Sequence, residues 1–366
     1  MSKRNLDFMN LALGVAQKGF GKVSPNPMVG AVLVKNGKII GKGWHKGFGL
    51  NHAEKDALIS AAKYDIFGST LYVNLEPCVF FENKKTDACS DLIVRSGIAK
   101  VFISHKDPNP KVCSRGISFL EKHGIIVELG LGENEANRIN EVYIKNMSTS
   151  LPFIAVKIAG SLDGRISTFS GDSRWITNLP ARKEVHRLRA DFDAVMTTSD
   201  TVIADDCDLG VRYVKGSDPL RVIVDKSLKT NLESLVYRDG NVIVFCGRDV
   251  LNVQKEKFKK SGVELVVVNE NVDGSGLDLR DILMELYGRG VMSVMVEAGG
   301  KFGAAILKSG FVDKFYYFIA PKFIGSDGIP ALNFNGISSI NDAFELKNVS
   351  YRQIARDILV EGKMSS

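Results

Sequence analysis

The hydrophobic pattern of this chain switches repeatedly between the period of a helix and that of a strand. Apolar residues three or four positions apart predict helices, and short apolar runs bounded by turn-forming residues predict strands. In the first half, the predicted helices are residues 5–18, 52–63, 88–96, 116–122 and 134–146. The predicted strands are residues 28–34, 39–40, 71–75, 101–104 and 125–129, with Asn36-Gly37 as a hairpin turn after the first. This alternation predicts an α/β sandwich.

The pattern restarts after the segment Ser148-Thr-Ser-Leu-Pro152, which is the best linker candidate in the chain. The predicted strands that follow are residues 153–158, 194–197, 221–224, 242–245, 263–268 and 293–296. The predicted helices are residues 180–188, 277–287 and 302–308. We see no internal repeat and no low-complexity segment. The sequence therefore predicts two α/β domains, residues 1–147 and 148–366.

Composition narrows the class of protein. The 366 residues are 45% hydrophobic and 25% charged, as in ordinary soluble proteins. No apolar run approaches the ~20 residues that span a bilayer, and the start lacks the apolar core of a secretory signal. Five cysteines without disulfide-framework spacing favour a reducing cytoplasm. The net charge is +6, but the lysines are spread out, so nucleic acid is not expected as the main partner.

The most informative chemical pattern is His52-Ala-Glu54 followed by Pro77-Cys78 and Cys89. One imidazole and two thiolates suit a tetrahedral zinc ion, and three protein ligands leave a fourth position open for water. Glu54 is placed to move protons from that water to a substrate. This set of residues predicts a zinc-dependent base deaminase. The alternative is that both cysteines are ordinary thiols and His52 is a surface residue.

A second pattern lies near the end of the chain, in Val296-Glu-Ala-Gly-Gly-Lys-Phe-Gly303. It predicts a strand that runs into glycines, which then open a helix. Small residues allow backbone N–H groups to approach an anion, and the helix N-terminus favours negative charge. The spacing is not that of a Rossmann Gly-x-Gly-x-x-Gly turn. The turn is typical of a phosphate-binding site, but glycine turns before helices are also common, and an ordinary helix start is the alternative interpretation.

Several segments together carry a resemblance to a known family. In order, they are Ser24-Pro-Asn-Pro-Met-Val-Gly30, Gly43-Trp-His45, His52-Ala-Glu54, Leu75-Glu-Pro-Cys78, Asp107-Pro-Asn-Pro110, Lys157-Ile-Ala-Gly-Ser-Leu-Asp-Gly-Arg165 and Gly171-Asp-Ser-Arg-Trp-Ile-Thr177. Over nearly its whole length the chain resembles the bifunctional riboflavin-biosynthesis deaminase/reductase family. The resemblance implies a cytidine-deaminase-like α/β/α sandwich followed by a dihydrofolate-reductase-like α/β domain. It also implies hydrolytic deamination of 2,5-diamino-6-(5-phosphoribosylamino)pyrimidin-4-one, then NADPH-dependent reduction of the ribosyl group to ribityl.

For the first domain, the resemblance implies one zinc ion per chain, bound by His52, Cys78 and Cys89, with Glu54 as the catalytic proton shuttle. The implied substrate contacts are Asn26, His45, Lys85, Asp107 and Asn109. Each also has a simpler interpretation, because Asn26, Asp107 and Asn109 are turn-forming types, His45 can be a packed imidazole and Lys85 a solvated loop residue.

For the second domain, the resemblance implies contacts to NADPH and to the phosphoribosyl substrate. The NADPH contacts would be Ala159, Trp175, Thr201, Asp205, Gly299, Gly300, Lys301, Phe302, Gly303, Ala304 and Ala305. The substrate contacts would be Ser173, Arg189, Leu209, Arg212 and Glu297. Asp205 is the candidate proton donor as hydride arrives, and arginines can bind phosphate through two N–H groups. The simpler interpretations are a solvated Asp205, a helix-capping Arg189 and a core Trp175.

The chain departs from the family in places that bear on both sites. Ten residues, 79–88, separate the two cysteines, which is two more than usual, and the usual histidine and prolines are missing. Asp200 replaces a glycine or serine, and would repel an NADPH phosphate unless it points away. Cys207 stands in place of a proline, and Lys226 in place of a serine that commonly contacts NADPH.

The sequence also allows two functions other than the bifunctional enzyme. The altered loop would fit a first domain that is only a scaffold beside an active reductase, although the retained ligands and Glu54 argue against this. A deaminase-fold protein that binds RNA, such as tRNA, is disfavoured by the absence of a basic tract and by the reductase-like half. We expect a small-molecule substrate, no nucleic acid or membrane partner, and a homo-oligomer formed through the reductase domain.

Overall fold

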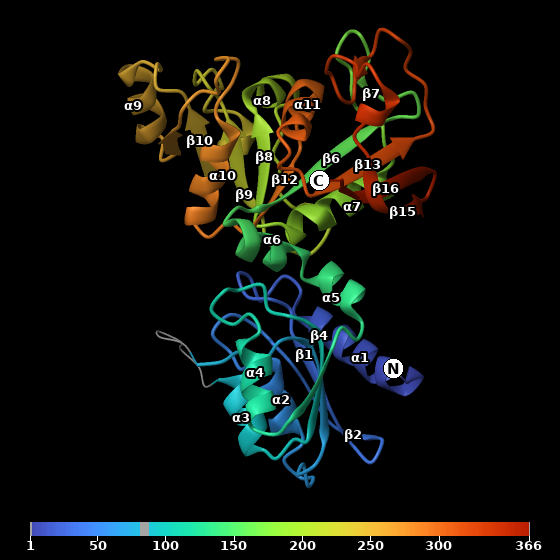
Figure 1. The fold of residues 1–366 in the computed structure, drawn as a ribbon. Coiled ribbons are helices and arrows are strands. Elements are labelled where there is room, and N and C mark those ends of the chain that lie inside the picture. The colour runs from blue at the N-terminus through green and yellow to red at the C-terminus, as the bar shows by residue number, and fades with distance from the viewer. Residues whose placement is uncertain (1, 81–87, 366) are drawn as a thin grey trace. The chain divides into compact units, whose positions relative to one another are not determined.

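The computed structural model describes residues 2–80 and 88–365, and the chain divides into two compact units, Met1–Ser150 and Leu151–Ser366 (Figure 1). The elements of the first unit are α1 Lys3–Ala16, η1 Gln17–Gly19, β1 Gly30–Lys35, β2 Lys38–Trp44, α2 Ala53–Ser60, β3 Thr70–Leu75, α3 Cys89–Arg95, β4 Lys100–His105, α4 Arg115–Lys122, β5 Ile126–Leu129, α5 Glu133–Ile139 and α6 Glu141–Thr149.

The first unit is a three-layer sandwich around a sheet of order β2-β1-β3-β4-β5. The first three strands pair antiparallel, whereas β3, β4 and β5 are parallel. Successive side chains of a strand point to opposite faces. Ala31 and Leu33 therefore pack with α2, α3 and α4 on one face, and Val32 and Val34 pack with α1 and α5 on the other. The predicted sandwich is confirmed.

The second unit contains a longer, mainly parallel sheet. Its elements are β6 Phe153–Ser161, β7 Arg165–Ser167, α7 Leu179–Asp191, β8 Ala194–Thr198, α8 Ser199–Asp205, β9 Leu220–Val224, η2 Leu235–Tyr237, β10 Val242–Cys246, α9 Asn252–Lys260, β11 Glu264–Val267, α10 Leu279–Gly288, β12 Ser293–Val296, α11 Gly300–Lys308, β13 Lys314–Ala320, β14 Ile329–Pro330, η3 Ile340–Asp342, β15 Leu346–Ile354 and β16 Asp357–Met364.

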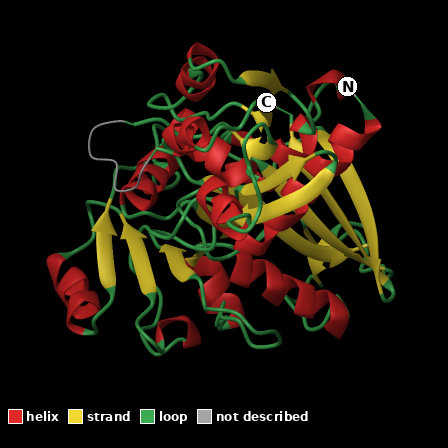
Figure 2. Ribbon diagram, turned by 90° about the horizontal axis from the view of Figure 1, so that it is seen from below, coloured by secondary structure: helices red, strands yellow, loops and turns green. Residues whose placement is uncertain are grey.

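The order of strands in this sheet is β11-β10-β9-β8-β12-β6-β13-β16-β15. The pairings from β11 to β13 are parallel, and β16 and β15 add antiparallel strands at one edge. Ile154, Val156 and Val294 share a buried core with α10 and α11. Helices flank the strands in Figure 2. Parallel strands buried on both faces explain the nearly continuous apolar runs of the sequence.

The structure corrects one predicted element. Residues 134–146 do not form a single helix, because α5 ends and α6 begins at Asn140. Asn140 is buried, its Oδ1 accepts from the Met28 backbone N–H at 2.8 Å, and its Nδ2 donates to the Met28 carbonyl at 3.0 Å. This side chain pairs with the backbone of a distant segment, and the helix breaks there. The strands β13, β15 and β16 and the helices α8 and α9 were not predicted.

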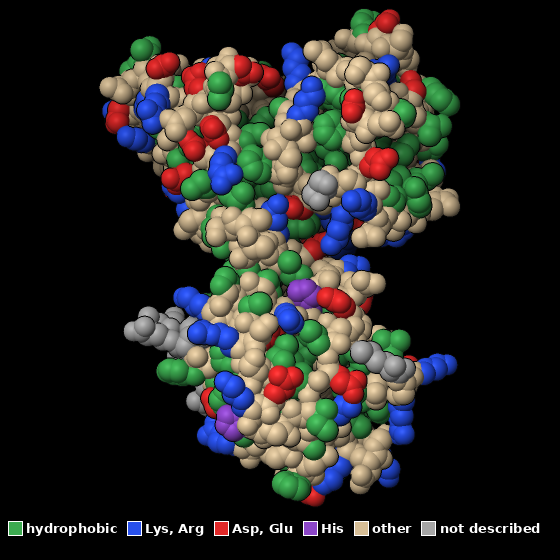
Figure 3. Space-filling model, viewed as in Figure 1, with side chains coloured by type: hydrophobic (Ala, Val, Ile, Leu, Met, Phe, Trp, Pro, Cys, Tyr) green, Lys and Arg blue, Asp and Glu red, His purple; other side chains and the backbone are tan. Residues whose placement is uncertain are grey.

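No helix in residues 2–80 and 88–365 is both long enough and apolar enough to cross a membrane. On the face of the molecule in Figure 3, Lys and Arg side chains are scattered among acidic ones and do not gather into a single patch.

Candidate functional site

His52, Cys78 and Cys89 are brought together from three different elements of the first unit. His52 is the residue before α2, Cys78 follows the end of β3, and Cys89 is the first residue of α3. His52 Nδ1 lies 3.5 Å from Cys78 Sγ and 3.3 Å from Cys89 Sγ. Tetrahedral zinc with ordinary bond lengths separates a nitrogen and a sulfur ligand by about 3.5 Å. The donor atoms therefore fit a zinc ion, with His52 Nδ1 as the nitrogen ligand.

Glu54 lies in the first turn of α2 and is directed into this cluster. The side chain is buried, and Oε2 has no hydrogen-bond partner among the described residues. Burial raises the pKa of Glu54, and the neighbouring Cys78 raises it further. A buried carboxylate oxygen without a partner is costly and marks a site where a ligand or water is expected. Glu54 is thus suited to exchanging protons with a molecule bound at the metal cluster.

Asn26 and His45 form a hydrogen-bonded pair next to His52. The Asn26 amide nitrogen lies 3.0 Å from His45 Nε2, and His45 Nδ1 lies 3.0 Å from the Asn51 carbonyl oxygen. A proton on Nδ1 satisfies both contacts, since Nε2 then accepts from Asn26. The ring centroids of His45 and His52 are 5.5 Å apart, and burial lowers the pKa of His45. The structure therefore places a buried imidazole, which the lowered pKa favours in its neutral form, next to the metal-ligand candidate His52.

Glu76 organises the loop that carries Asp107 and Asn109. Its two carboxylate oxygens accept from backbone N–H groups at 2.8 to 3.2 Å, and the donors are Asp107, Ser114, Gly116 and Ile117. This role of Glu76 was not predicted, although an acidic residue between a buried strand and a predicted metal ligand is a usable signal.

Asp107 itself is buried and interacts with a residue that the sequence did not single out. Tyr143 of α6 donates to Asp107 Oδ1 at 2.9 Å, and the Asn109 N–H donates to the same atom at 2.9 Å. Burial raises the pKa of Asp107 to about 6, with smaller contributions from the charges of Glu76 and Cys78, while its hydrogen bonds from Asn109 and Tyr143 act in the opposite direction. Lys85 lies outside the described residues.

The second unit has a large cavity at the carboxyl ends of β6, β8, β9 and β12, which we call the second-unit cavity. Its volume is about 1550 Å³, above the roughly 300–1,000 Å³ of common ligand pockets. The carboxyl ends of parallel strands are the general binding edge of such sheets. The predicted residues that line it are Ala159, Ser173, Trp175, Arg189, Thr201, Asp205, Leu209, Arg212, Glu297, Gly299, Gly300, Lys301, Phe302 and Ala305.

Two predicted cofactor residues do not line this cavity. Gly303 and Ala304 are buried in the second turn of α11, away from the loop that opens the helix. The predicted run of contacts is therefore interrupted, because Phe302 and Ala305 line the cavity and the two residues between them do not. Gly299 and Gly300 do form the turn, and a Cβ atom on Gly300 would lie 2.3 Å from the Pro330 carbonyl oxygen. Glycine at position 300 is therefore required by the close approach of another segment.

A buried ion-pair group lies at the floor of the second-unit cavity. Arg189 Nε donates to Glu297 Oε1 at 2.6 Å and its Nη2 to Oε2 at 3.1 Å, and Lys157 Nζ donates to Oε2 at 3.0 Å. The two cations outweigh the effect of burial and hold the pKa of Glu297 well below its usual range. Lys157 was missed, although a lone charge inside an apolar strand requires a buried counter-charge.

Asp205 ends α8 and faces the same cavity. Burial raises its pKa, and the positive charges of Arg174 and Lys157 oppose this effect. Trp175 is 59% exposed, so the interpretation as a core residue is wrong, and the Arg182 guanidinium lies 3.9 Å from its ring centroid. Thr201 Oγ1 accepts from the Gly299 N–H at 3.3 Å, which joins the start of α8 to the glycine turn.

Asp200 and Lys226 are the two charged residues that depart from the family pattern, and each forms an ion pair with a residue of opposite charge. Asp200 forms an ion pair with Lys229, and Lys226 Nζ lies 2.6 Å from Glu270 Oε2. Asp200, Lys226 and Lys229 all line the second-unit cavity. The negative charge of Asp200 at the edge of this cavity is therefore offset by Lys229.

Comparison with known proteins identifies both units. Residues 2–105 match the cytidine and deoxycytidylate deaminase zinc-binding region, and residues 152–360 match the RibD C-terminal domain. The chain is 38% identical to the riboflavin biosynthesis protein RibD of Aquifex aeolicus, over 97% of each chain. It is 36% identical to RibD of Actinobacillus pleuropneumoniae, over 98% of this chain and 94% of that one.

Two solved structures are similar over nearly the whole chain. RibD of Acinetobacter baumannii has a TM-score of 0.86 at 32% identity and covers 100% of this chain and 99% of its own. The Thermotoga maritima diaminohydroxyphosphoribosylaminopyrimidine deaminase/5-amino-6-(5-phosphoribosylamino)uracil reductase has a TM-score of 0.84 at 35% identity, with 99% of both chains covered. The chain belongs to the RibD family of bifunctional riboflavin-biosynthesis deaminase/reductases.

Proposed function

We propose that residues 1–147 carry the zinc-dependent deamination of the family and that residues 148–366 carry its NADPH-dependent reduction. The substrate of the first step would be 2,5-diamino-6-(5-phosphoribosylamino)pyrimidin-4-one, whose 2-amino group is replaced by oxygen. In the second step, the ribosyl group is reduced to a ribityl chain. The observation that supports the first assignment best is the convergence of His52, Cys78 and Cys89 beside the buried Glu54.

In the deaminase site, His52, Cys78 and Cys89 would hold zinc, which supplies Lewis-acid activation of water. Glu54 would take a proton from that water and deliver protons to the ring nitrogen and the leaving amine. Asn26 and His45 would hold the pyrimidine through hydrogen bonds of fixed direction, since the Asn51 carbonyl sets the tautomer of His45. Asp107 and Asn109 would complete the pocket, held in place by Glu76. Lys85 would contribute a further contact.

In the reductase site, NADPH supplies the hydride and the protein supplies orientation. Gly299, Gly300 and Thr201 would present backbone and hydroxyl groups to the cofactor, together with Ala159 and Trp175. The remaining cofactor contacts would come from Lys301, Phe302 and Ala305.

The sugar phosphate would lie on the other side of the second-unit cavity. Arg189, Arg212, Ser173 and Leu209 would hold it, and Glu297 would accept from sugar hydroxyls. Asp205 would deliver a proton as hydride reaches C1′ of the opened sugar. Its pKa, raised by burial, suits a group that must hold a proton near neutral pH.

We further propose that the enzyme acts in the cytoplasm on this small molecule, without nucleic acid, and forms homo-oligomers through its second unit. The scattered charge on the visible face gives no support to a polynucleotide partner.

Removal of the metal tests whether deamination and reduction belong to separate units. Protein stripped of zinc by a chelator should release no ammonia from the diamino substrate, and added zinc should restore the release. The stripped protein should still oxidise NADPH when given the pre-deaminated substrate. Persistent ammonia release without zinc would refute the metal assignment. Zinc-replete protein that oxidises NADPH only with pre-deaminated substrate would show that the first unit is a scaffold.

A further inference from the structure

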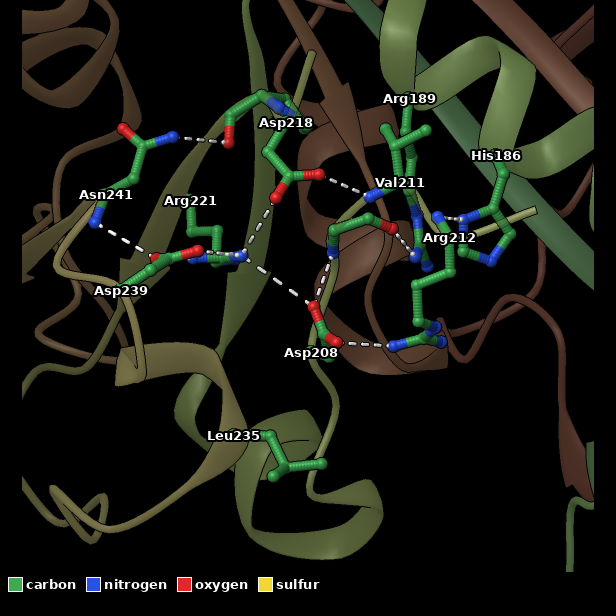
Figure 4. A network of polar contacts seen from close by, with 12 residues as sticks. His186, Arg189, Asp208, Val211, Arg212, Asp218, Arg221, Leu235, Asp239 and Asn241 are labelled. Atoms are coloured by element: carbon green, nitrogen blue, oxygen red, sulfur yellow. Dashed lines mark hydrogen bonds and ion pairs between the residues drawn. The ribbon is translucent and has the colours of Figure 1, made fainter. Parts of the chain in front are cut away.

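Arg221 is a buried cation that the proposed chemistry does not use. It lies on β9 with its side chain 3% exposed, yet three carboxylates surround its guanidinium (Figure 4). Asp239 pairs with both of its terminal nitrogens, Asp208 Oδ1 lies 3.7 Å from Nη2, and Asp218 Oδ2 lies 3.8 Å from Nη2. A charge is rarely buried without such partners, so the group acts as one electrostatic unit.

Two of these carboxylates hold the loop between α8 and β9. Asp208 Oδ1 accepts from the Gly210 N–H at 2.9 Å, and Asp218 Oδ1 accepts from the Val211 N–H at 2.6 Å. Arg221 therefore helps to hold the backbone amides of Gly210 and Val211, the first through Asp208 and the second through Asp218. Asp239 differs, because it accepts from Arg221 and from the Asn241 N–H, which lies outside this loop.

The loop held in this way carries groups that line the second-unit cavity. Leu209 is buried with a left-handed backbone (φ 61°), a strained conformation for leucine that needs support from its surroundings. Arg212 Nη1 donates to Asp208 Oδ2 at 2.6 Å, and its backbone N–H donates to His186 Nδ1 at 3.1 Å. Asp208 thus lies between two guanidinium groups, the buried one of Arg221 and the half-exposed one of Arg212 (Figure 4).

We propose that Arg221 is a positioning residue for the phosphate subsite of the reductase, acting through Asp208 and Asp218 to hold Arg212 toward the substrate phosphate. The proposal rests on the proposed function, because that function makes Arg212 a substrate contact. Arg221 shares the negative charge of Asp208, which leaves more of the positive charge of Arg212 for an anion. Without Arg221, the negative charge of Asp208 would act on Arg212 alone, and the carboxylates of Asp218 and Asp239 would lose their shared cation, which would weaken the attraction of this loop for a phosphate.

Arg221→Met tests this with pre-deaminated substrate in two forms, with and without the 5′-phosphate. We expect the KM for the phosphorylated form to rise about tenfold or more, because displacement of a binding group by about 1 Å has effects of this size. The KM for NADPH and the kcat/KM for the dephosphorylated form should change less than about twofold. Arg221→Lys, which keeps the charge, should recover part of the difference. Equal losses with both forms of substrate would overturn the proposal.

Two milder substitutions test the positioning role of Arg221 if Arg221→Met does not fold. Asp218→Asn weakens the link from Arg221 to the Val211 amide, whereas Asp239→Asn weakens an exposed partner of Arg221. Asp218→Asn should raise the KM for the phosphorylated form only, and Asp239→Asn should leave it unchanged. Equal effects from the two variants would mean that the network serves stability alone, and would overturn the proposal.

Arg212→Ala separates this proposal from the function on which it rests. If Arg212→Ala leaves the preference for the phosphorylated substrate unchanged, the assignment of Arg212 itself is wrong. If Arg212→Ala removes the preference while Arg221→Met and Asp218→Asn retain it, only the positioning role of Arg221 fails.

Discussion

The two candidate sites balance their charges in different ways. In the first unit, donor atoms of three ligands converge, and the buried Glu54 has a carboxylate oxygen without a partner in the described part of the chain. In the second unit, Glu297 is neutralised by Arg189 and Lys157 of the same chain. Among the described residues, the first site thus lacks a cation of its own, whereas in the second the charge of Glu297 is met by two cations of the same chain, which leaves one positive charge in excess.

Because the Glu297 carboxylate is the shared partner of two buried cations, we expect its loss to destabilise the fold of the second unit. Glu297→Ala would leave Arg189 and Lys157 as buried cations without their shared partner. Breaking a buried ion pair in this way costs about 3–5 kcal/mol of unfolding free energy. Chemical denaturation followed by a probe in the second unit should show this loss, while zinc binding by the first unit stays the same.

Glu264→Ala is the matched control. Glu264 pairs with Arg289 on the surface, and their side chains are 55% and 33% exposed. An exposed pair contributes about 0–1 kcal/mol. If Glu297→Ala costs no more than Glu264→Ala, the second site is not held together by its internal charges.

A smaller effect is expected from His186, which links α7 to the Arg212 loop. Burial, together with the charges of Arg189 and Arg212, lowers the pKa of His186 to about 4. The unfolded chain therefore binds one more proton than the folded chain between about pH 6.5 and pH 4. The stability that depends on neutral His186 is complete above about pH 6.5 and is lost as the pH falls toward 4.

Replacing His186 with Gln should remove this pH dependence, because an amide oxygen accepts from the Arg212 N–H without titrating. The wild-type protein should lose on the order of 3 kcal/mol more than the variant between pH 7 and pH 4. Unfolding measured across this range gives the difference directly. Parallel stability profiles would show that His186 is not kept neutral by the fold.

The smallest effect concerns Asp200 and Lys229. Lys229→Ala should weaken NADPH binding by at most about fivefold, since an exposed ion pair is worth about 0.2–1 kcal/mol. The double variant Asp200→Asn with Lys229→Ala should recover wild-type affinity, because both charges are gone. Cofactor titration at low salt provides the measurement. An affinity unchanged by Lys229→Ala would show that Asp200 does not act on the cofactor.

The first site was more predictable than the second because its chemistry is carried by residue type. His52, Cys78 and Cys89 are rare ligands in a recognisable order, so their convergence could be expected before the fold was known. Lys157 and Arg221 are common types whose roles depend on which strands lie side by side. Their partners Glu297 and Asp239 are 140 and 18 residues away along the chain, and no local pattern links them.

In the fold, too, elements marked by residue type were predictable and elements that depend on distant contacts were not. Strands such as β6 and β8 are largely buried on both faces, and apart from Lys157 their residues are apolar or small. In β15 at the sheet edge most positions are exposed, and the sequence Leu346-Lys-Asn-Val-Ser-Tyr-Arg-Gln-Ile354 has no apolar run to mark a strand. The break at Asn140 was also missed, since it depends on hydrogen bonds to Met28.

The most direct test of two independent sites is a reciprocal pair of variants, Glu54→Gln and Asp205→Asn, each assayed for both reactions. We expect Glu54→Gln to lose deamination by about 10²–10⁴-fold, as measured by ammonia release, while NADPH oxidation with pre-deaminated substrate is retained. Asp205→Asn should show the opposite, with ammonia release intact and NADPH oxidation lost. Loss of both activities in either folded variant would contradict the division of function between the two units.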